Sequence, residues 1–320
     1  MSPPTVPAVP SGRTAQRLEW VHLPPPVRAL VEDRLGAPVV RAESQRSGFT
    51  PGFASVLECA DGSLHFVKAA SVKAQRSFAA AYREEGRKAL ALPPEAPATR
   101  LAWVHDADDW VVLGFEHVEA RAPHRPWTDD DLDACLDMLS AAADTLTPPP
   151  HGLTIDDAVT DFREWPAAWR HTLATFDLPH GREAAALARR YAEVVGGSTL
   201  VHGDVRDDNL LLTDDGRVLL CGWNWPVRGA AWLDSLILLV GPRGDGLDVE
   251  AVLATHPTFA GVEPEAVDIV LALLTGYFLT HSDDPVPSSS PHIRDHQLWQ
   301  GEVLWEWLCE RRGWPPEPDR

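Results

Sequence analysis

The residues best suited to chemistry lie between His202 and Asn209, in the segment HGDVRDDN. Asp204 can accept a proton from a hydroxyl group, and Asn209, five residues further on, can bind a metal ion. Apolar runs on both sides predict a loop that leaves one strand and enters another. The spacing H-x-D-x-x-x-x-N is typical of phosphoryl transfer, in which the carboxylate orients the nucleophile and the amide binds magnesium. An acidic turn in which Asp and Asn serve only turn chemistry is the structural alternative.

A phosphoryl-transfer site also needs a cation for the nucleotide phosphates and an acid to hold that cation. Lys68 ends the apolar run FVK and is one of only three lysines in the chain. Glu85, on the helix expected to follow, is the predicted partner, and Glu84 is a near alternative. A strand-edge lysine and a solvated helix face are the structural alternatives for these residues.

These motifs resemble the aminoglycoside phosphotransferase family, which includes choline kinase-like enzymes. The resemblance rests on the HGD sequence and on the R-E-E to L-P stretch of residues 83–93, and it covers about residues 27–314. It implies a small-molecule kinase that uses ATP and Mg²⁺ and phosphorylates a hydroxyl of a small acceptor. It also implies an α+β fold, bilobal and protein-kinase-like, with a five-stranded antiparallel small lobe that carries one helix and a larger, mostly helical lobe.

The resemblance assigns further roles by position. Backbone N–H groups of Gly48 and Gly52, in the turn 47–53, would face the phosphates, although such turns are also ordinary loop chemistry. Glu116 and Val118, with Phe115 and His117 beside them, would form the hinge that receives the adenine. Arg206 would neutralise the transferred phosphate or pair with a neighbouring carboxylate. Asp208 and His202 would brace the loop, and Asp234 would bind its backbone.

One position departs from the family pattern. The family carries a second metal-binding Asp after the next strand, and alignment on Trp223 places Gly222 there. Glycine has no side chain, and the neighbouring Cys221 is a poor ligand for magnesium, which prefers oxygen. Either activity is lost, or Asp207 or Asp208 takes the metal. The alternative function is therefore a catalytically inactive kinase-like protein that binds a nucleotide or small molecule.

Periodicity, capping and turn signals divide the chain into a flexible tail (1–18), a nucleotide-binding lobe (19–116) and a catalytic and substrate-binding lobe (117–320). Trp299, Trp305 and Trp307 are expected to anchor the last helix in the core, and stacking on a sugar-like or aromatic substrate is the alternative use. In the first lobe we expect helices over 27–35 and 77–92 and strands over 39–43, 54–59, 64–69, 101–105 and 110–115. In the second we expect helices over 128–146, 155–169, 182–195, 231–240, 264–279 and 291–312.

Composition excludes several classes of protein. The chain has 320 residues, 44% of them hydrophobic, and a formal net charge of −19. This charge argues against a nucleic-acid partner, which would need a basic surface. It suits a cationic acceptor and equally suits a solvated acidic surface. The absence of a long apolar run or signal-peptide pattern predicts no membrane partner and, with four scattered cysteines, a cytoplasmic location. Nothing in the sequence specifies an oligomeric state.

Overall fold

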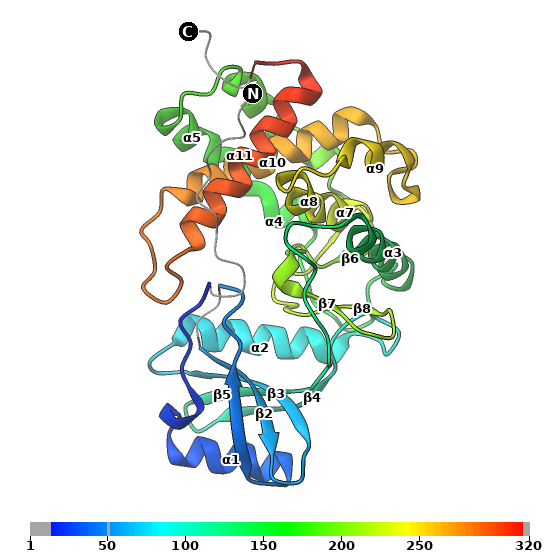
Figure 1. The fold of residues 1–320 in the computed structure, drawn as a ribbon. Coiled ribbons are helices and arrows are strands. Elements are labelled where there is room, and N and C mark those ends of the chain that lie inside the picture. The colour runs from blue at the N-terminus through cyan, green and yellow to red at the C-terminus, as the bar shows by residue number, and fades with distance from the viewer. Residues whose placement is uncertain (1–13, 50–51, 316–320) are drawn as a thin grey trace.

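A computed structural model describes residues 14–49 and 52–315. The chain forms two lobes, a small one built around a sheet and a larger helical one (Figure 1). This arrangement confirms the α+β, two-lobed fold expected from the sequence. None of the helices within the described ranges is both long and apolar enough to cross a membrane.

The small lobe is built on one antiparallel sheet with the strand order β1-β2-β3-β5-β4. One face of the sheet packs on α1 and the other on α2, so the lobe has two α-helices where the fold prediction named one. Helix α1 starts with proline and stops at Gly36, whose φ of +82° is left-handed and suits glycine. The elements are α1 (Pro25–Leu35), β1 (Val39–Ser44), β2 (Phe53–Cys59), β3 (Leu64–Ser71), α2 (Arg76–Ala91), β4 (Leu101–Ala107) and β5 (Trp110–Glu116).

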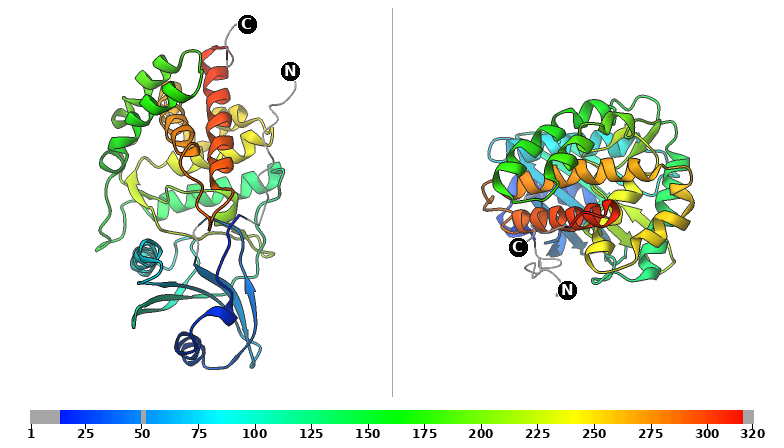
Figure 2. Two further views of the ribbon diagram at one scale, coloured as in Figure 1. Left: turned by 90° about the vertical axis from the view of Figure 1, so that its left-hand side faces the viewer. Right: turned by 90° about the horizontal axis from the view of Figure 1, so that it is seen from above.

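The large lobe packs its helices around one apolar core, with two short antiparallel ribbons next to the small lobe (Figures 1 and 2). The ribbons are the pairs β6-β9 and β7-β8. Its helices are α3 (Asp129–Thr145), α4 (Ala158–Asp161), α5 (Trp169–Thr175), α6 (Gly181–Ala188), α7 (Leu233–Leu238), α8 (Val240–Gly244), α9 (Val249–Thr255), α10 (Pro264–Ser282) and α11 (Ile293–Arg312). Its strands are β6 (Thr199–Val201), β7 (Leu210–Leu212), β8 (Val218–Leu220) and β9 (Val227–Gly229).

Helices α10 and α11 pack against each other along much of their length. Their contact is close at Gly301, where an added Cβ would lie 2.5 Å from the Leu279 side chain and 3.1 Å from its backbone nitrogen. Trp305 and Trp307 of α11 are buried in the core, as the sequence predicted, whereas Trp299 is only partly buried against it. The indole of Trp307 also donates to Glu250 Oε1 over 2.6 Å, so its polar edge is satisfied.

Two predicted helices of the large lobe were wrong in extent. The stretch 155–169 contains only one turn of α-helix, α4, followed by a 3₁₀ helix over Phe162–Ala168. Pro166 lies inside that stretch; it has no N–H to donate, and its ring disfavours a regular α-helix. The predicted helix 182–195 stops at Ala188, after which the chain continues through a 3₁₀ turn, Tyr191–Glu193.

Residues 14–18, the first that the structure describes, pack against the rest of the protein. We call residues 14–18 the N-terminal strap. Its backbone donates from Thr14 to Arg46 O over 2.9 Å and from Gln16 to Ser289 O over 3.0 Å, which connects it to both lobes. Thr14 is 7% exposed. The sequence placed these five residues in a flexible tail, and there the structure differs; residues 1–13 of that predicted tail lie outside the described ranges.

Candidate active site

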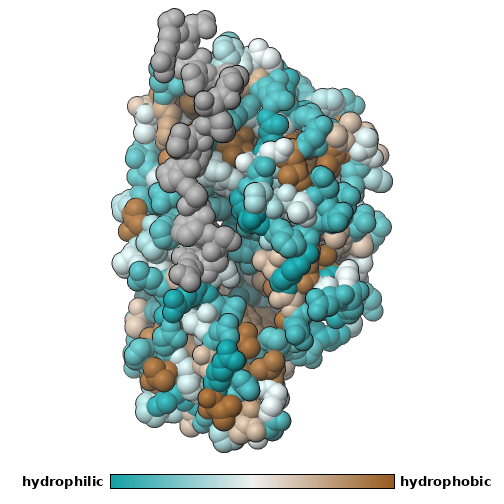
Figure 3. Space-filling model, in the orientation of Figure 1, coloured by the Kyte–Doolittle hydropathy of each residue, from teal (hydrophilic) through white to brown (hydrophobic). Residues whose placement is uncertain are grey.

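A cavity of about 680 Å³ lies between the lobes. In the space-filling view the molecule is hollowed between the small lobe, below, and the large lobe, above, and most of this face is hydrophilic (Figure 3). Lys68 and Glu85 line the cavity from the small lobe, and Asp204, Arg206 and Asn209 line it from the large lobe. The fold therefore brings these five predicted residues together, although Lys68 and Asn209 are 141 positions apart in sequence.

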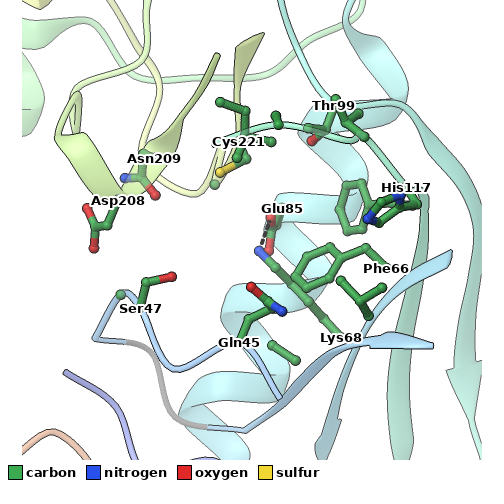
Figure 4. Close-up of a pocket in the computed structure, with 18 of the residues that line it drawn as sticks. Gln45, Ser47, Phe66, Lys68, Glu85, Thr99, His117, Asp208, Asn209 and Cys221 are labelled. Atoms are coloured by element: carbon green, nitrogen blue, oxygen red, sulfur yellow. Dashed lines mark hydrogen bonds and ion pairs between the residues drawn. The ribbon is translucent and has the colours of Figure 1, made fainter. Parts of the chain in front are cut away.

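Lys68 and Glu85 form a buried ion pair. The Nζ atom of Lys68 lies 2.5 Å from Oε1 of Glu85, whose side chain is 2% exposed (Figure 4). Lys68 is on β3 and Glu85 on α2, which packs over that strand. Burial has the largest single effect on the pKa of Lys68 and lowers it, but the charge and hydrogen bond of Glu85, together with Tyr82, raise the net pKa, so the ammonium stays charged. Glu84, the alternative partner, pairs instead with Arg87 at 2.7 Å.

Asp234 fixes the start of the loop 202–209 through hydrogen bonds to its backbone. Its carboxylate accepts hydrogen bonds from the backbone nitrogens of His202 at 2.6 Å and Gly203 at 2.9 Å. His202 is buried, and its Nε2 lies 3.0 Å from the carbonyl oxygen of Cys221. Desolvation lowers the pKa of His202, so the ring is neutral near pH 7 and acts as a packed brace. These contacts fix the direction in which Asp204 points.

Arg206 lies between two carboxylates. It donates to Asp204 Oδ1 through Nη1 and to Asp208 Oδ1 through Nε at 2.9 Å. Burial raises the pKa of Asp204 to about 6, with the Arg206 charge opposing that rise and Asp208 adding to it. Asp204 is thus ionised near pH 7 but close enough to neutrality to take up a proton. The net pKa of Asp208 is lowered: desolvation raises it, and the charge and hydrogen bonds of Arg206, with smaller contributions from its surroundings, together more than compensate.

Asn209 is hydrogen-bonded to Asp204, the predicted base. Its Nδ2 donates to the backbone oxygen of Asp204 at 2.8 Å and to the Oδ2 atom of Asp204 at 3.2 Å. Its Oδ1 faces Gly222, where an added Cβ would lie 3.0 Å away. The φ angle of Gly222 is +79°, a left-handed backbone that disfavours other residues.

The side chains present offer magnesium few uncommitted oxygens. In nucleotide sites magnesium is usually held by one or two carboxylates together with substrate phosphates and waters. Asn209 offers one amide oxygen, both Asp208 oxygens accept from Arg206, and Asp207 is paired with Arg125 at 2.8 Å. Desolvation raises the pKa of Cys221 to about 11, so its thiol is protonated. Within residues 14–49 and 52–315, no group of three or more His, Cys, Asp or Glu is placed to hold a metal ion.

The turn predicted to cover phosphates reaches across to the large lobe. Gly48 lines the cavity, and an added Cβ there would lie 3.7 Å from Asp208 Oδ2. In Figure 4 Ser47 lies across from Asp208 and Asn209. Gly52 is not among the cavity-lining residues: it packs under Tyr82, whose hydroxyl would lie 3.0 Å from an added Cβ. The intervening residues, 50 and 51, lie outside the described ranges.

The predicted hinge closes the other end of the cavity. Glu116, His117 and Val118 line it, beside Phe66 and Phe115. Figure 4 shows His117 and Phe66 on the side of the cavity away from Asp208. The backbone nitrogen of Glu116 donates to Arg100 O over 3.0 Å, so that group is already satisfied by the protein.

Sequence reasoning missed Arg17, which also lines the cavity. It belongs to the N-terminal strap, and its Nη2 donates to Ser47 O over 2.7 Å. It missed Phe49 as well, whose ring lies 5.4 Å from the Arg206 guanidinium and stacks on His296 at 4.9 Å between centroids. No local signal pointed to either residue, because both act through contacts with distant segments.

Comparison with known proteins extends this description at the level of fold. No protein-family model and no curated protein matches the sequence. Solved structures do match. A thermostable mutant of the aminoglycoside phosphotransferase APH(4)-Ia, in a ternary complex with AMP-PNP and hygromycin B, superposes with a TM-score of 0.61 and 14% identity over 89% of this chain and 98% of that one. LicA in complex with AMP superposes with a TM-score of 0.57 and 11% identity, over 89% of this chain and 99% of that one.

At these identities the likeness concerns the fold. This chain has the kinase-like fold of the aminoglycoside phosphotransferases, as the sequence motifs predicted.

Proposed function

We propose that this protein binds ATP between its lobes and transfers the γ-phosphate to a hydroxyl of a small molecule. One observation carries the proposal: the Lys68–Glu85 pair and the Asp204–Asn209 couple, from different lobes, line a single cavity. A lysine for the phosphates and a carboxylate for the acceptor hydroxyl are what this reaction asks of side chains. Proteins of the same fold bind ADP, AMP-PNP or AMP in their solved structures, which supports a nucleotide site here.

Each residue has a defined part in the proposed reaction. The ammonium of Lys68, fixed by Glu85, holds the α- and β-phosphates, and the hinge residues Glu116 and Val118 border the adenine. The acceptor oxygen attacks the γ-phosphorus while Asp204 takes the hydroxyl proton. The bond between the γ-phosphorus and the β,γ-bridging oxygen breaks, and ADP leaves with that oxygen. Asn209 keeps Asp204 oriented through its two hydrogen bonds.

The acceptor is proposed to be a hydroxylated and cationic molecule. Burial raises the pKa of Tyr277, and the negative charges of Asp204, Asp161 and Asp284 raise it further. Tyr277 thus lies near Asp204 and two further carboxylates of the large lobe, with the Arg294 charge acting in the opposite direction. Negative potential in a cleft attracts cations. The net charge of −19 acts in the same direction.

A second function is favoured by Gly222. A protein that binds a nucleotide or small molecule without turning it over needs Lys68 and the hinge but no metal-binding carboxylate. The position of Gly222 removes that carboxylate and leaves a donor set unsuited to magnesium. This alternative keeps the same cavity and the same ligand and differs only in the chemistry.

A transfer assay separates the two functions. Purified protein is incubated with γ-labelled ATP and a panel of hydroxylated amines and sugars, and labelled product is counted. Transfer that is lost in Asp204→Asn and kept in Asp214→Asn, an exposed carboxylate in a turn, supports the kinase. ATP binding with no transfer to any acceptor, also in Gly222→Asp, supports the binding protein. Failure to bind ATP at all refutes the kinase and the nucleotide-binding form of the alternative.

A further inference from the structure

A nucleoside triphosphate brings several negative charges into this cavity, and something must neutralise them. In kinases most of that task falls to magnesium ions that bridge the β- and γ-phosphates. Here position 222 has no carboxylate, and Arg206 and Arg125 already engage Asp208 and Asp207, so the oxygen that faces position 222 is Asn209 Oδ1. Positive charge at that end of the site must therefore come from the protein.

Arg206 supplies one such charge. It stands two residues after Asp204, lines the cavity, and is 20% exposed. Phe49 covers its guanidinium at 5.4 Å, which shields the charge from water. A guanidinium presents five N–H donors in a planar fork that suits phosphate oxygens. Two carboxylates already hold it in a fixed orientation, so little rotamer entropy remains to be lost on binding.

Arg17 supplies a second charge from the opposite side. It reaches the cavity from the N-terminal strap, where Leu18 N donates to Gly52 O over 3.3 Å and Gln16 N to Ser289 O over 3.0 Å. Its Nη2 lies against the turn that faces Asp208, with Ser47 O at 2.7 Å and an added Gly48 Cβ at 3.3 Å. The strap thus carries a cation to the place where the turn 47–49 would meet the terminal phosphates.

We propose that Arg17 and Arg206, together with Lys68, neutralise the triphosphate in place of a divalent metal, so that this protein binds nucleoside triphosphate without magnesium. The inference rests on the proposed nucleotide site and specifies how that site is charged. Arg17 and Arg206 exchange part of their present hydrogen bonds for phosphate oxygens, while Lys68 contacts the α/β end. Charge-assisted hydrogen bonds to phosphate are strong enough for this role.

The test is a titration of the full chain with ATP and with AMP, in excess EDTA and in millimolar magnesium, followed by calorimetry. We expect the ATP dissociation constant in EDTA to lie within about threefold of its value with magnesium, because no bound metal contributes. Binding that strengthens by more than about tenfold on adding magnesium would overturn the inference and leave the proposed nucleotide site intact. No ATP binding under either condition would refute that site itself.

Variants identify the charges. Arg17→Gln should weaken ATP about tenfold in EDTA and leave AMP, which lacks the terminal phosphates, almost unchanged. Arg17→Lys should recover part of the loss. Arg46→Gln is the matched control, since Arg46 is next to the strap and 59% exposed but does not line the cavity. The assignment would be contradicted if Arg17→Gln weakened the affinities for ATP and AMP equally. It would also be contradicted if Arg17→Gln and Arg46→Gln weakened ATP binding equally.

Discussion

Gly222 faces the amide of Asn209, and a Cβ at residue 222 would lie 3.0 Å from its Oδ1 atom. A carboxylate introduced at this position would therefore enter the space beside the predicted metal ligand. The backbone there is left-handed, with φ of +79°, which asparagine and aspartate tolerate better than other residues do. A substitution at position 222 can therefore test whether the site depends on a metal ion.

The first prediction concerns Gly222→Asp. We expect ATP to stabilise this variant more in magnesium than in EDTA, because an acid and an amide now share one edge of the cavity. The free energy of unfolding without ligand should fall by about 1–2 kcal/mol because of the left-handed backbone. Thermal-shift titration measures both effects.

Gly216→Asp is the matched control for that experiment. Its φ is +83° and nothing lies within 4 Å of an added Cβ, so it carries the same backbone cost on an exposed turn without a metal partner. A magnesium response in Gly216→Asp, or none in Gly222→Asp, would contradict the prediction.

The second prediction concerns pH. Burial raises the pKa of Asp204 to about 6, and only the ionised carboxylate can take a proton from the acceptor. The initial rate of phosphate transfer should therefore fall as pH decreases through about 6, by tenfold per unit well below it. We call this fall in rate the acidic limb of the pH profile. Because the Arg206 charge lowers the pKa of Asp204, Arg206→Gln should move the acidic limb to higher pH.

Arg206→Lys serves as the control for the pH experiment, since it keeps the charge and loses the fork geometry. Its limb should stay near that of the unmodified protein. A profile that is flat across this range, or a limb that moves to lower pH in Arg206→Gln, would show that Asp204 is not the group observed.

The third prediction concerns the buried pair. Lys68→Met leaves Glu85 almost fully buried without its counter-ion, and Glu85→Gln leaves the lysine without its own. Each should lower the free energy of unfolding by about 3 kcal/mol, and the double variant should lose less than the sum. Denaturant unfolding of the four proteins measures the coupling.

A surface pair gives the comparison. Lys73 and Asp109 also lie 2.5 Å apart, but their side chains are 77% and 51% exposed. Breaking that pair should cost less than about 1 kcal/mol. Similar losses for the two pairs would mean that the burial of Glu85 contributes nothing.

The fourth prediction concerns the packing of α10 on α11. Gly301→Ala places a methyl group 2.5 Å from a Leu279 side-chain carbon and 3.1 Å from the backbone nitrogen of Leu279, which cannot easily move. We expect a loss of about 1–3 kcal/mol in the free energy of unfolding. Gly196→Ala, whose methyl would meet only Val159 at an ordinary 3.8 Å, should be near neutral, and a neutral Gly301→Ala would show that the helices can separate without cost.

The sequence predicted best what is encoded locally. The apolar alternation of β3, the proline-to-glycine limits of α1 and the dense polar loop 202–209 are short-range signals, and the structure has these elements where they were expected. The helix over 155–169 was wrong because Pro166 interrupts an otherwise helical composition. Arg17 and Phe49 were missed because their roles depend on contacts with distant residues: Arg17 with Ser47, and Phe49 with Ser290 and Arg206.

The strap has a consequence for nucleotide exchange. Gln16 donates to Ser289 O, and the Ser290 hydroxyl donates to Phe49 O, so the small lobe is tied to the loop before α11 at two points. Parting the lobes widely enough to free a ligand requires both ties to break together. Residence times in this cleft should therefore depend on how fast the two ties open, and deletion of the N-terminal strap, which removes the first of them, should speed release more than it alters the starting affinity for the adenosine half of the ligand.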